Sequence, residues 1–360
     1  MATAISKPVR LQTWLFLLAA LSFAAPSYAS EPDSSLEEVF SAVDGSVVLV
    51  RTRERMPVGQ DSFGQIPFID QGSGVLISKD GDVLTAAHLV QVADAVQVEF
   101  VDGTQVSATV VASEPAADLA LLKLSWVPDG AVVAKLGESD AVRVGQQIFV
   151  IGAPYGLSHT LSVGRISGRH LPGTLGGPLY LAELFQADVA IHRGNSGGPM
   201  FDLDGEVVGI VSHYLSESGA FEGVGFSVTS NSIKELLLTR PSPWSGISVF
   251  ALDERLAGFL NLPQEAGLLV QRVAAGSPGA QLGLLPGYVR AKIGEQELLL
   301  GGDVILDVDG LTVGTSESYI PLREHLSEIQ PGQTVRVKVL RRGKIVELSA
   351  VFGEQASERR

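Results

Sequence analysis

Short apolar runs dominate the chain from Ser46 to about Val228, and glycine, Asp-Gly or proline separates them. Examples are SVVLVRT, GSGVLIS, VQVEFVDG, QIFVIG and VVGIVSH, which have the length of single strands. Asp-Gly pairs within 79–81, 101–103 and 203–205 predict hairpin turns, because this pair tolerates the positive φ of a tight turn. Many short strands at this spacing predict a mainly β fold, either a barrel or a sandwich.

Helical patterns are few in this part of the chain. SLEEVFSAV, residues 35–43, predicts one helix, and SNSIKELLLTR predicts a second with Ser230 as its N-cap. The second pattern runs into RPSPWSG, where two prolines within three residues cannot continue a helix. We therefore predict a domain boundary near Pro241.

The remainder of the chain has the size of one small β-rich domain, about 110 residues. GLLVQRV, DVILDVDG and TVRVKVLRRGKIVELSAVF resemble strands, and two pieces near Ala280–Leu284 and Tyr319–Glu328 resemble helices. The predicted organisation is one domain over residues 30–240, a second over 241–352 and a polar tail over 353–360.

Residues 1–29 have the features of a secretion signal. Lys7 and Arg10 precede the apolar run Leu11–Ala25, and SYA then offers small residues for cleavage before Ser30. A retained membrane anchor is the alternative, but about 15 apolar residues are fewer than the ~20 that a spanning helix needs. The basic start and alanine-rich run favour export to a bacterial periplasm.

Composition excludes several classes of function. The chain has 26 Lys and Arg against 40 Asp and Glu, a net charge of −14, whereas a nucleic-acid-binding protein needs a basic face. It has no cysteine, which excludes disulfides, cysteine catalysis and Cys-ligated zinc or iron–sulfur sites. Its six histidines show no metalloprotease-type pair, so we expect neither a catalytic metal nor a cofactor.

GNSGGP, residues 194–199, places one serine among three glycines. A serine hydroxyl is a poor nucleophile without a base, and acyl transfer also needs donors for the oxyanion. The motif predicts Ser196 as the nucleophile and Gly194, Asn195 and Ser196 as the oxyanion loop, with the backbone amides of Gly194 and Ser196 as donors. A surface turn is the alternative. The motif is more specific than a lone GxSxG and lacks the strand–turn–helix setting of an α/β-hydrolase.

A histidine and an acid complete the predicted triad. VLTAAHLV places His88 after an apolar run, beside small alanines that leave room for an imidazole at a crowded junction. Asp118 begins the alternating run DLALLKL, while Asp94, in a polar helix or turn, and Asp102, in a hairpin, are competing acids. The chain order His88, Asp118, Ser196 is that of the chymotrypsin-type triad.

The other histidines have weaker settings. His213 follows an apolar run and could line a pocket, and His192 lies in a loop four residues before Ser196. Three more lie in polar loops or helices, where we expect solvated side chains: His159, His170 and His325.

GSGVLISKDGDVLTAAHLV, ADLALLKL, QIFVIGAPYGL, VAIHRGNSGGPMFDLDGEVVGIV and GVGFSV together closely resemble the HtrA/Deg serine proteases. Past the boundary, WSGISV, GLLVQRVAAGSPGAQLGLLPG and GGDVILDVDGLTV resemble a PDZ domain of that family, so the likeness covers about residues 36–352. It implies a chymotrypsin-like double β-barrel followed by one PDZ domain. His88 would be the general base, Asp118 its orienting acid and Ser196 the nucleophile.

The resemblance also implies partners. Family members usually form homotrimers and degrade or process damaged exported proteins, and many switch the loops around the oxyanion hole between inactive and active arrangements. PDZ domains bind a C-terminal peptide as an added strand, and the loop that would hold its carboxylate here is Ser245, Gly246 and Ile247. The resulting hypothesis is an exported, ATP-independent serine endopeptidase for unfolded polypeptides, in contact with a membrane only if the N-terminal segment is retained. The alternatives are a latent protease that acts mainly as a peptide-binding chaperone or scaffold, and an esterase, which the PDZ domain disfavours.

A specificity pocket follows from the same resemblance. In a chymotrypsin-like fold its floor lies six residues before the nucleophile, which is Ala190 here, followed by Ile191. No acid stands there, so we expect a modest aliphatic residue at the cleavage site rather than lysine or arginine. His213 and Tyr214 are expected in the wall of the pocket.

The chain departs from the family pattern at three places. His192-Arg193 stands where most relatives carry Asn-Pro, and the missing proline could alter how readily the oxyanion hole forms. RERMPVGQDSFGQIPFID is a short loop for the family, and YVRAKIGEQELLL is an extra stretch that could reshape the peptide groove or the contact with the protease domain. With one PDZ domain, we do not expect large cage-like assemblies.

Overall fold

The computed structural model describes residues 34–57, 65–174, 181–214, 223–293 and 296–353. The predicted signal sequence, its cleavage point before Ser30 and most of the predicted tail lie outside these residues. Within them, no helix is long and apolar enough to cross a membrane.

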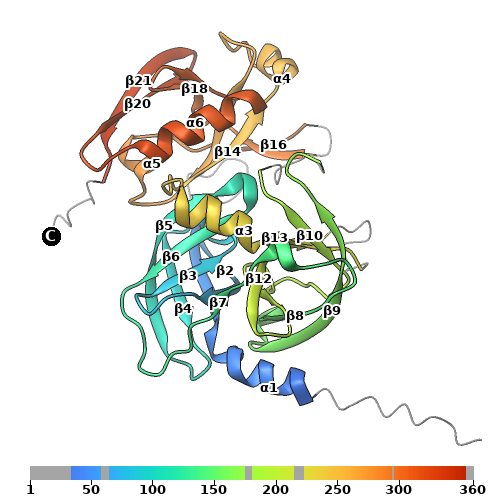
Figure 1. Cartoon of the computed structure of the whole chain (residues 1–360). Helices are drawn as coiled ribbons and strands as arrows, with labels where there is room; N and C mark the ends of the chain where they lie inside the picture. The colour runs from blue at the N-terminus through green and yellow to red at the C-terminus, as the bar shows by residue number, and fades with distance from the viewer. Residues whose placement is uncertain (1–33, 58–64, 175–180, 215–222, 294–295, 354–360) are drawn as a thin grey trace, which may run out of the picture. The chain divides into compact units, whose positions relative to one another are not determined.

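Six antiparallel strands close a first barrel in the order β1-β2-β3-β6-β5-β4 (Figure 1). They are β1 (Val47–Pro57), β2 (Gln65–Leu76), β3 (Asp82–Thr85), β4 (Ala95–Glu99), β5 (Gln105–Glu114) and β6 (Leu119–Leu124). In β4, Val96 and Val98 are buried while Ala95 and Gln97 face outward, because successive side chains of a strand point to opposite faces. The alternation read from the sequence therefore places the barrel interior.

Six further strands close a second barrel in the order β11-β8-β9-β10-β13-β12, completed by the pairing of β11 with β12. They are β8 (Gln147–Gly152), β9 (Thr160–His170), β10 (Leu184–Ala187), β11 (Pro199–Phe201), β12 (Glu206–Tyr214) and β13 (Gly225–Thr229). A short strand, β7 (Lys135–Leu136), adds to β12 in parallel. The three predicted Asp-Gly turns join β2 to β3, β4 to β5 and β11 to β12.

One hydrophobic cluster joins the two barrels. Its centre includes the rings of Phe149 and Phe201, which stack with centroids 5.2 Å apart. Fully buried aliphatic side chains from both barrels surround them: Val75, Leu84, Leu119, Ile151, Ile210 and Val228. Burial of this much apolar surface holds the barrels together and fixes the seam between them.

Helices and helical turns are short and connect the strands. They are α1 (Ser34–Val43), η1 (Asp44–Ser46), α2 (Ala87–Val90), η2 (Pro115–Ala117), η3 (Ser139–Ala141), η4 (Pro154–Gly156) and α3 (Ser230–Ile233), which continues as a π-helical turn, η6 (Lys234–Thr239). The predicted helix after β13 is present, but Thr229 occupies its N-cap position. Ser230 is one residue inside, where its hydroxyl donates to the carbonyl of Gly137 at 2.9 Å.

The C-terminal domain contains an antiparallel sheet in the order β14-β15-β18-β20-β21, with β14 at one edge. Its elements are β14 (Ile247–Leu252), α4 (Glu254–Phe259), β15 (Gly267–Val273), α5 (Pro278–Gln281), β18 (Val304–Val308), β19 (Leu311–Thr312), α6 (Ser316–Glu328), β20 (Thr334–Arg341) and β21 (Lys344–Val351). The extra stretch noted in the sequence contains two strands, β16 (Val289–Ile293) and β17 (Gln296–Leu300), that pair as a separate two-stranded sheet. A double barrel followed by a small β-rich domain confirms the predicted fold class.

Both helices expected in this domain begin earlier than predicted, because a side chain caps each one. The Ser277 hydroxyl accepts from the amide of Ala280 at 3.2 Å, so α5 starts at Pro278, which suits a first turn. Thr315 accepts from the amide of Ser318 at 3.2 Å and starts α6 at Ser316.

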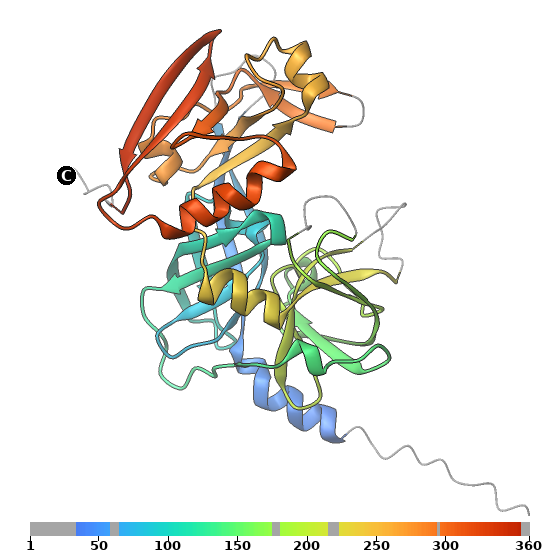
Figure 2. The same ribbon diagram turned by 45° about the horizontal axis from the view of Figure 1, so that its top comes forward.

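From Ser35 onward the chain forms one compact unit, in which α6 contacts the first barrel (Figure 2). Glu114, at the end of β5, is fully buried and accepts hydrogen bonds from Tyr319 and Arg323 of α6. A second nitrogen of Arg323 donates to the carbonyl of Arg240 at 2.7 Å. A buried carboxylate is costly unless it is paired, so these contacts hold α6 against β5, four residues before Asp118.

Candidate active site

Asp118 follows the turn η2 in the left-handed conformation, with φ of 52°. Both of its carboxylate oxygens lie 2.9 Å from Nδ1 of His88, and one also accepts from the backbone amide of His88 at 3.0 Å. The hydroxyl of Ser212 donates to the other oxygen. Burial alone would raise the pKa of Asp118, but the bonds and charge of His88 and the bond from Ser212 outweigh it and lower that pKa.

His88 is the second residue of α2, whose neighbours Ala86 and Ala87 are buried with almost no exposed surface. The small residues seen beside His88 in the sequence are thus interior positions of the first barrel. Burial lowers the pKa of His88. The hydrogen bond and charge of Asp118, together with the charge of Asp70, outweigh this effect and raise the pKa above its ordinary value. Because Asp118 engages Nδ1, Nε2 is the ring nitrogen left for a reacting group, and 48% of the side chain stays exposed.

Ser196 lies in a loop whose glycines are required by space and by backbone conformation. Gly194 and Gly197 have φ of 104° and 81°, and a Cβ added to them would lie 2.0 Å from the Ala153 carbonyl oxygen and 2.3 Å from that of Ser73. The Ser196 hydroxyl donates to the carbonyl of Ser212 at 3.1 Å. Its donor is therefore engaged by β12 and must rotate to reach His88.

The amides of the loop divide into two groups. Those of Asn195, Gly197 and Gly198 donate to backbone carbonyls of the loop itself and of β12. Among the described residues, no group accepts from the amides of Gly194 or Ser196. These are the two donors expected to stabilise an oxyanion.

Arg193, one of the departures from the family pattern, contributes to this arrangement through its backbone. Its carbonyl accepts from the amide of Tyr155 in η4 at 2.9 Å. Carbonyl and N–H point in opposite directions across a trans peptide, so this bond turns the amide of Gly194 away from η4. The contact from Tyr155 thus orients the loop that lacks the family's proline.

Of the predicted pocket residues, Ala190 contacts the serine loop directly. The carbonyl of Ala190 accepts from the Asn195 side chain at 3.3 Å. Ile191 is buried, and its Cδ1 lies 2.4 Å from where a Cβ of Gly225 would be, so it packs on that glycine. Tyr214 ends β12, where its backbone pairs with Gly225; its side chain is outside the described part.

His213 stacks on the ring of Phe226 with centroids 5.2 Å apart, and Nδ1 lies 3.3 Å from the Ser212 hydroxyl. Burial lowers the pKa of His213, and the charge of Asp118 only partly opposes this. His213 therefore supplies a neutral aromatic surface near the seam.

Two histidines expected to be solvated are not. His159 is 17% exposed in its side chain, and its Nδ1 lies 2.8 Å from Asp44. His170 lies 3.0 Å from the Gln186 side-chain oxygen and packs its edge against Phe226. Partners distant in the sequence leave both histidines half-buried. His325 is 38% exposed and lies 3.0 Å from Asp309.

The competing acids lie elsewhere. Asp94 accepts from the side chain of Arg55 at 2.7 Å and from the amide of Ala275 at 2.6 Å. Asp102 caps its own hairpin by accepting from the amide of Thr104. Ser212 contacts both Asp118 and Ser196 but is not among the residues predicted from the sequence. Its place at the end of an apolar run, just before His213, was the available signal.

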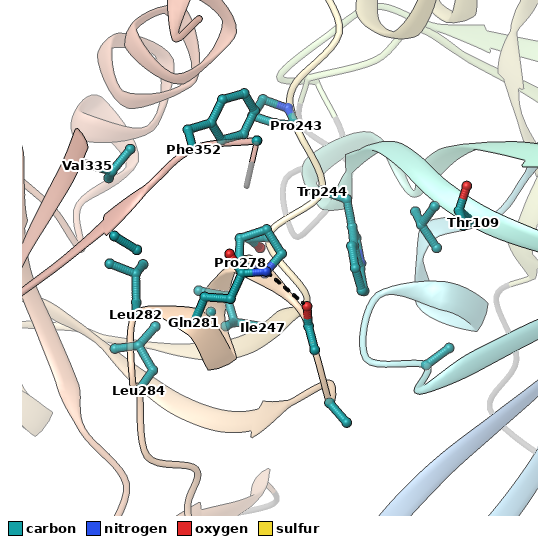
Figure 3. A pocket seen from close by; sticks show the side chains of 18 of the residues that line it. Thr109, Pro243, Trp244, Ile247, Pro278, Gln281, Leu282, Leu284, Val335 and Phe352 are labelled. Atoms are coloured by element: carbon teal, nitrogen blue, oxygen red, sulfur yellow. Dashed lines mark hydrogen bonds between the residues drawn. The ribbon is translucent and has the colours of Figure 1, made fainter. Parts of the chain in front are cut away.

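The predicted carboxylate-binding loop precedes the edge strand β14. Gly246 has φ of 67°, and the carbonyls of Ser245 and Gly246 accept from Gly279 and Ala274 within the domain. No described residue accepts from the amides of Ser245 and Gly246. A cavity of about 550 Å³ lies beside this loop (Figure 3). Its apolar lining includes Trp244, Ile247, Leu282, Leu284 and Leu326.

Comparison with known proteins gives two domain matches. Residues 72–210 match the trypsin-like peptidase domain, and residues 223–351 match the PDZ domain. The chain is 36% identical over 293 residues to a probable periplasmic serine endoprotease DegP-like of Hahella chejuensis, covering 79% of this chain and 57% of that protein. It is 34% identical over 289 residues to the protein of the same description from Halomonas elongata, covering 79% and 56%. The chain thus spans about half the length of these curated relatives.

Solved structures give a closer match in length. The HtrA-type protease AlgW with a decapeptide is 29% identical, with a TM-score of 0.50, covering 88% of this chain and 97% of that chain. A variant of AlgW with a tripeptide is 30% identical, with a TM-score of 0.51, covering 88% and 95%.

Proposed function

We propose that this chain, which belongs to the HtrA-type serine proteases, is an endopeptidase that cleaves unfolded or damaged polypeptides without ATP. The observation that carries the proposal is the contact of His88 with Asp118, together with a serine loop in which two amides have no acceptor among the described residues. A surface turn would need neither feature. Loss of casein degradation on replacing Ser196, argued in the Discussion, is its test.

The proposed reaction is acyl transfer. The Ser196 hydroxyl turns from the Ser212 carbonyl to Nε2 of His88, gives up its proton there and attacks the scissile carbonyl. The amides of Gly194 and Ser196 bind the oxyanion of the tetrahedral intermediate. His88 then protonates the leaving amine, and water hydrolyses the acyl-enzyme by the same steps. Asp118 keeps Nδ1 protonated and stabilises the imidazolium.

Latency is the second candidate, and one observation favours it. The Ser196 hydroxyl is bonded to Ser212 at 3.1 Å, so the chain would need a rotation before it could cut. A latent protease could still act as a peptide-binding chaperone or scaffold. Suppression of aggregation by a protein that does not degrade casein would support this role.

The proposed cleavage preference is for a modest aliphatic residue on the amino side of the cut bond. Ala190 and Ile191 bring no acid to the pocket, and His213 is held neutral by burial. Peptides released from denatured casein, mapped by mass spectrometry, should therefore end mainly in Val, Ala, Ile or Leu. Predominant cleavage after Lys or Arg would refute this pocket.

The C-terminal domain is proposed to bind polypeptide C-termini. A peptide would add as a strand to the free edge of β14, and its carboxylate would bind to the loop of Ser245, Gly246 and Ile247. The amides of Ser245 and Gly246, which have no acceptor in the described part of the chain, support this proposal. The apolar cavity suits an apolar last side chain. AlgW was solved with a decapeptide and with a tripeptide.

Location and assembly complete the proposal. Two curated relatives are described as periplasmic, and we infer the same location here, with cleavage before Ser30. A homotrimer through the protease domain is supported by apolar side chains that stay 68–74% exposed on β2 and beside η4: Ile69, Tyr155 and Leu157. Sedimentation equilibrium of the mature chain tests the trimer, and a monomer mass would contradict it.

A further inference from the structure

Gln91 makes an unusual set of contacts. It directly follows α2, three residues after His88, and only 9% of it is exposed. Its side-chain nitrogen donates to the carbonyl of Ile247 at 2.8 Å and lies 3.3 Å from the Ser245 hydroxyl. Its side-chain oxygen accepts from the hydroxyl of Ser113 at 2.6 Å. The polar groups of this side chain are thus engaged, and two of their three partners lie in the proposed carboxylate-binding loop.

A second bond fixes Gln91 to the same segment. The indole N–H of Trp244 donates to the backbone carbonyl of Gln91 at 2.9 Å. Gln91 therefore meets the segment before β14 through both its backbone and its side chain. Ser113, its partner on the barrel side, lies one residue before the buried Glu114 and five before Asp118.

The carbonyl of Ile247 has a particular place in strand addition. Ile247 is the first residue of β14, whose other neighbour in the sheet is absent among the described strands. This carbonyl accepts from Gln91, which is not part of the sheet, so it points to the open side of the strand. A peptide added there would donate a backbone N–H close to its own carboxyl end to this same carbonyl. The side-chain amide N–H of Gln91 is the same kind of donor as a peptide N–H.

We propose that Gln91 is an internal ligand of this loop, which a C-terminal peptide must displace from the Ile247 carbonyl in order to bind. The proposal rests on the peptide-binding role proposed above for Ser245, Gly246 and Ile247. Displacement removes a direct link between the loop and the segment that carries His88. The peptide that competes has a free carboxylate for the loop amides and an apolar last residue for the cavity lined by Trp244 and Leu284 (Figure 3).

The test measures peptide affinity in the full mature chain carrying Ser196→Ala, so that the probe is not digested. The probe is a fluorescein-labelled decapeptide ending in Leu-Val-Leu with a free carboxylate, followed by fluorescence anisotropy. Gln91→Met keeps the length of the side chain and removes its hydrogen-bonding groups. Because a competing hydrogen bond is worth about 1 kcal/mol, we expect roughly 3- to 10-fold tighter binding in this variant.

Two controls separate competition from a general disturbance. Gln105→Met makes the same change on the exposed start of β5, where Gln105 contacts Glu99, and should leave the affinity unchanged. Ser113→Ala removes the anchor of the Gln91 side chain without touching the loop. It should also tighten binding, by less than Gln91→Met, and it serves as the test if Gln91→Met does not fold.

Each outcome decides between the proposals. Tighter binding in Gln91→Met, with an amidated probe that binds poorly, supports the internal ligand. Binding of the free-acid probe that is equal or weaker in Gln91→Met overturns it and leaves the peptide-binding role standing. A probe that binds none of the variants, or binds equally well when amidated, overturns both. Binding seen only in Gln91→Met would show complete masking by Gln91.

Discussion

Ser196→Ala is expected to lower the degradation of denatured casein by roughly 10⁶-fold, the loss typical when the nucleophile of a serine protease triad is removed. Without the hydroxyl, no acyl-enzyme can form, and only the loop amides remain to assist attack by water. The rate of release of quenched fluorescent fragments measures the effect. Within the described residues, the Ser196 side chain makes one hydrogen bond, from its hydroxyl to the carbonyl of Ser212. Losing this single bond should leave the fold intact.

Ser125→Ala is the matched control, because Ser125 is an exposed serine on the first barrel and lies outside the proposed site. It should degrade casein at the rate of the unaltered chain. Equal activity in the unaltered chain and in Ser196→Ala would refute the triad. If both fail to cut casein and both suppress aggregation of an unfolded protein, the chaperone role replaces the protease.

Asp118→Asn is expected to lower kcat by about 10⁴-fold, as replacing the orienting acid does in related triads. The amide cannot hold Nδ1 of His88 protonated, so Nε2 loses its role as acceptor for the Ser196 proton. The pH profile should change as well. Asp118 raises the pKa of His88, and the neutral imidazole is the base, so activity in the unaltered chain should rise with pH through a value above about 6.5. In Asp118→Asn the pKa of His88 should be lower, so the rise of the residual activity with increasing pH should be centred at a lower pH than in the unaltered chain.

Asp94→Asn provides the comparison for this prediction. Asp94 is one of the two competing acids in the sequence, and its contacts are with Arg55 and Ala275, away from His88. Its replacement should leave kcat within about a factor of two, because neither of these contacts reaches the proposed triad. A large loss in Asp94→Asn with normal activity in Asp118→Asn would reverse the assignment of the acid.

The mainly β fold could be predicted because its signals are local, whereas the double barrel was implied only by the resemblance to the HtrA/Deg family. The alternation in AVQVE, the Asp-Gly turns and the prolines after Arg240 each act within a few residues, and the structure follows them. The first residue of a helix is harder to predict, because caps such as Ser277 and Thr315 extend a helix beyond its apolar pattern. Proline at the first turn of α5 was a usable signal for the earlier start.

The candidate site was predictable in its members but not in its hydrogen bonding. The order of His88, Asp118 and Ser196 could be read along the chain, whereas the bond from the Ser196 hydroxyl to Ser212 depends on how β12 packs. The contacts of His159 with Asp44 and of Gln91 with Ile247 join residues more than 100 positions apart. No local pattern encodes such pairings, so they required the folded chain.

Labelling with a fluorophosphonate probe tests whether Ser196 is an activated nucleophile, because the probe reacts with an activated serine and leaves other hydroxyls unmodified. The unaltered chain is incubated with the probe, digested and analysed by mass spectrometry. We predict one modified serine, Ser196, and loss of the modification in His88→Ala, which removes the base. Modification of another serine, or equal labelling of Ser196 in His88→Ala, would contradict it.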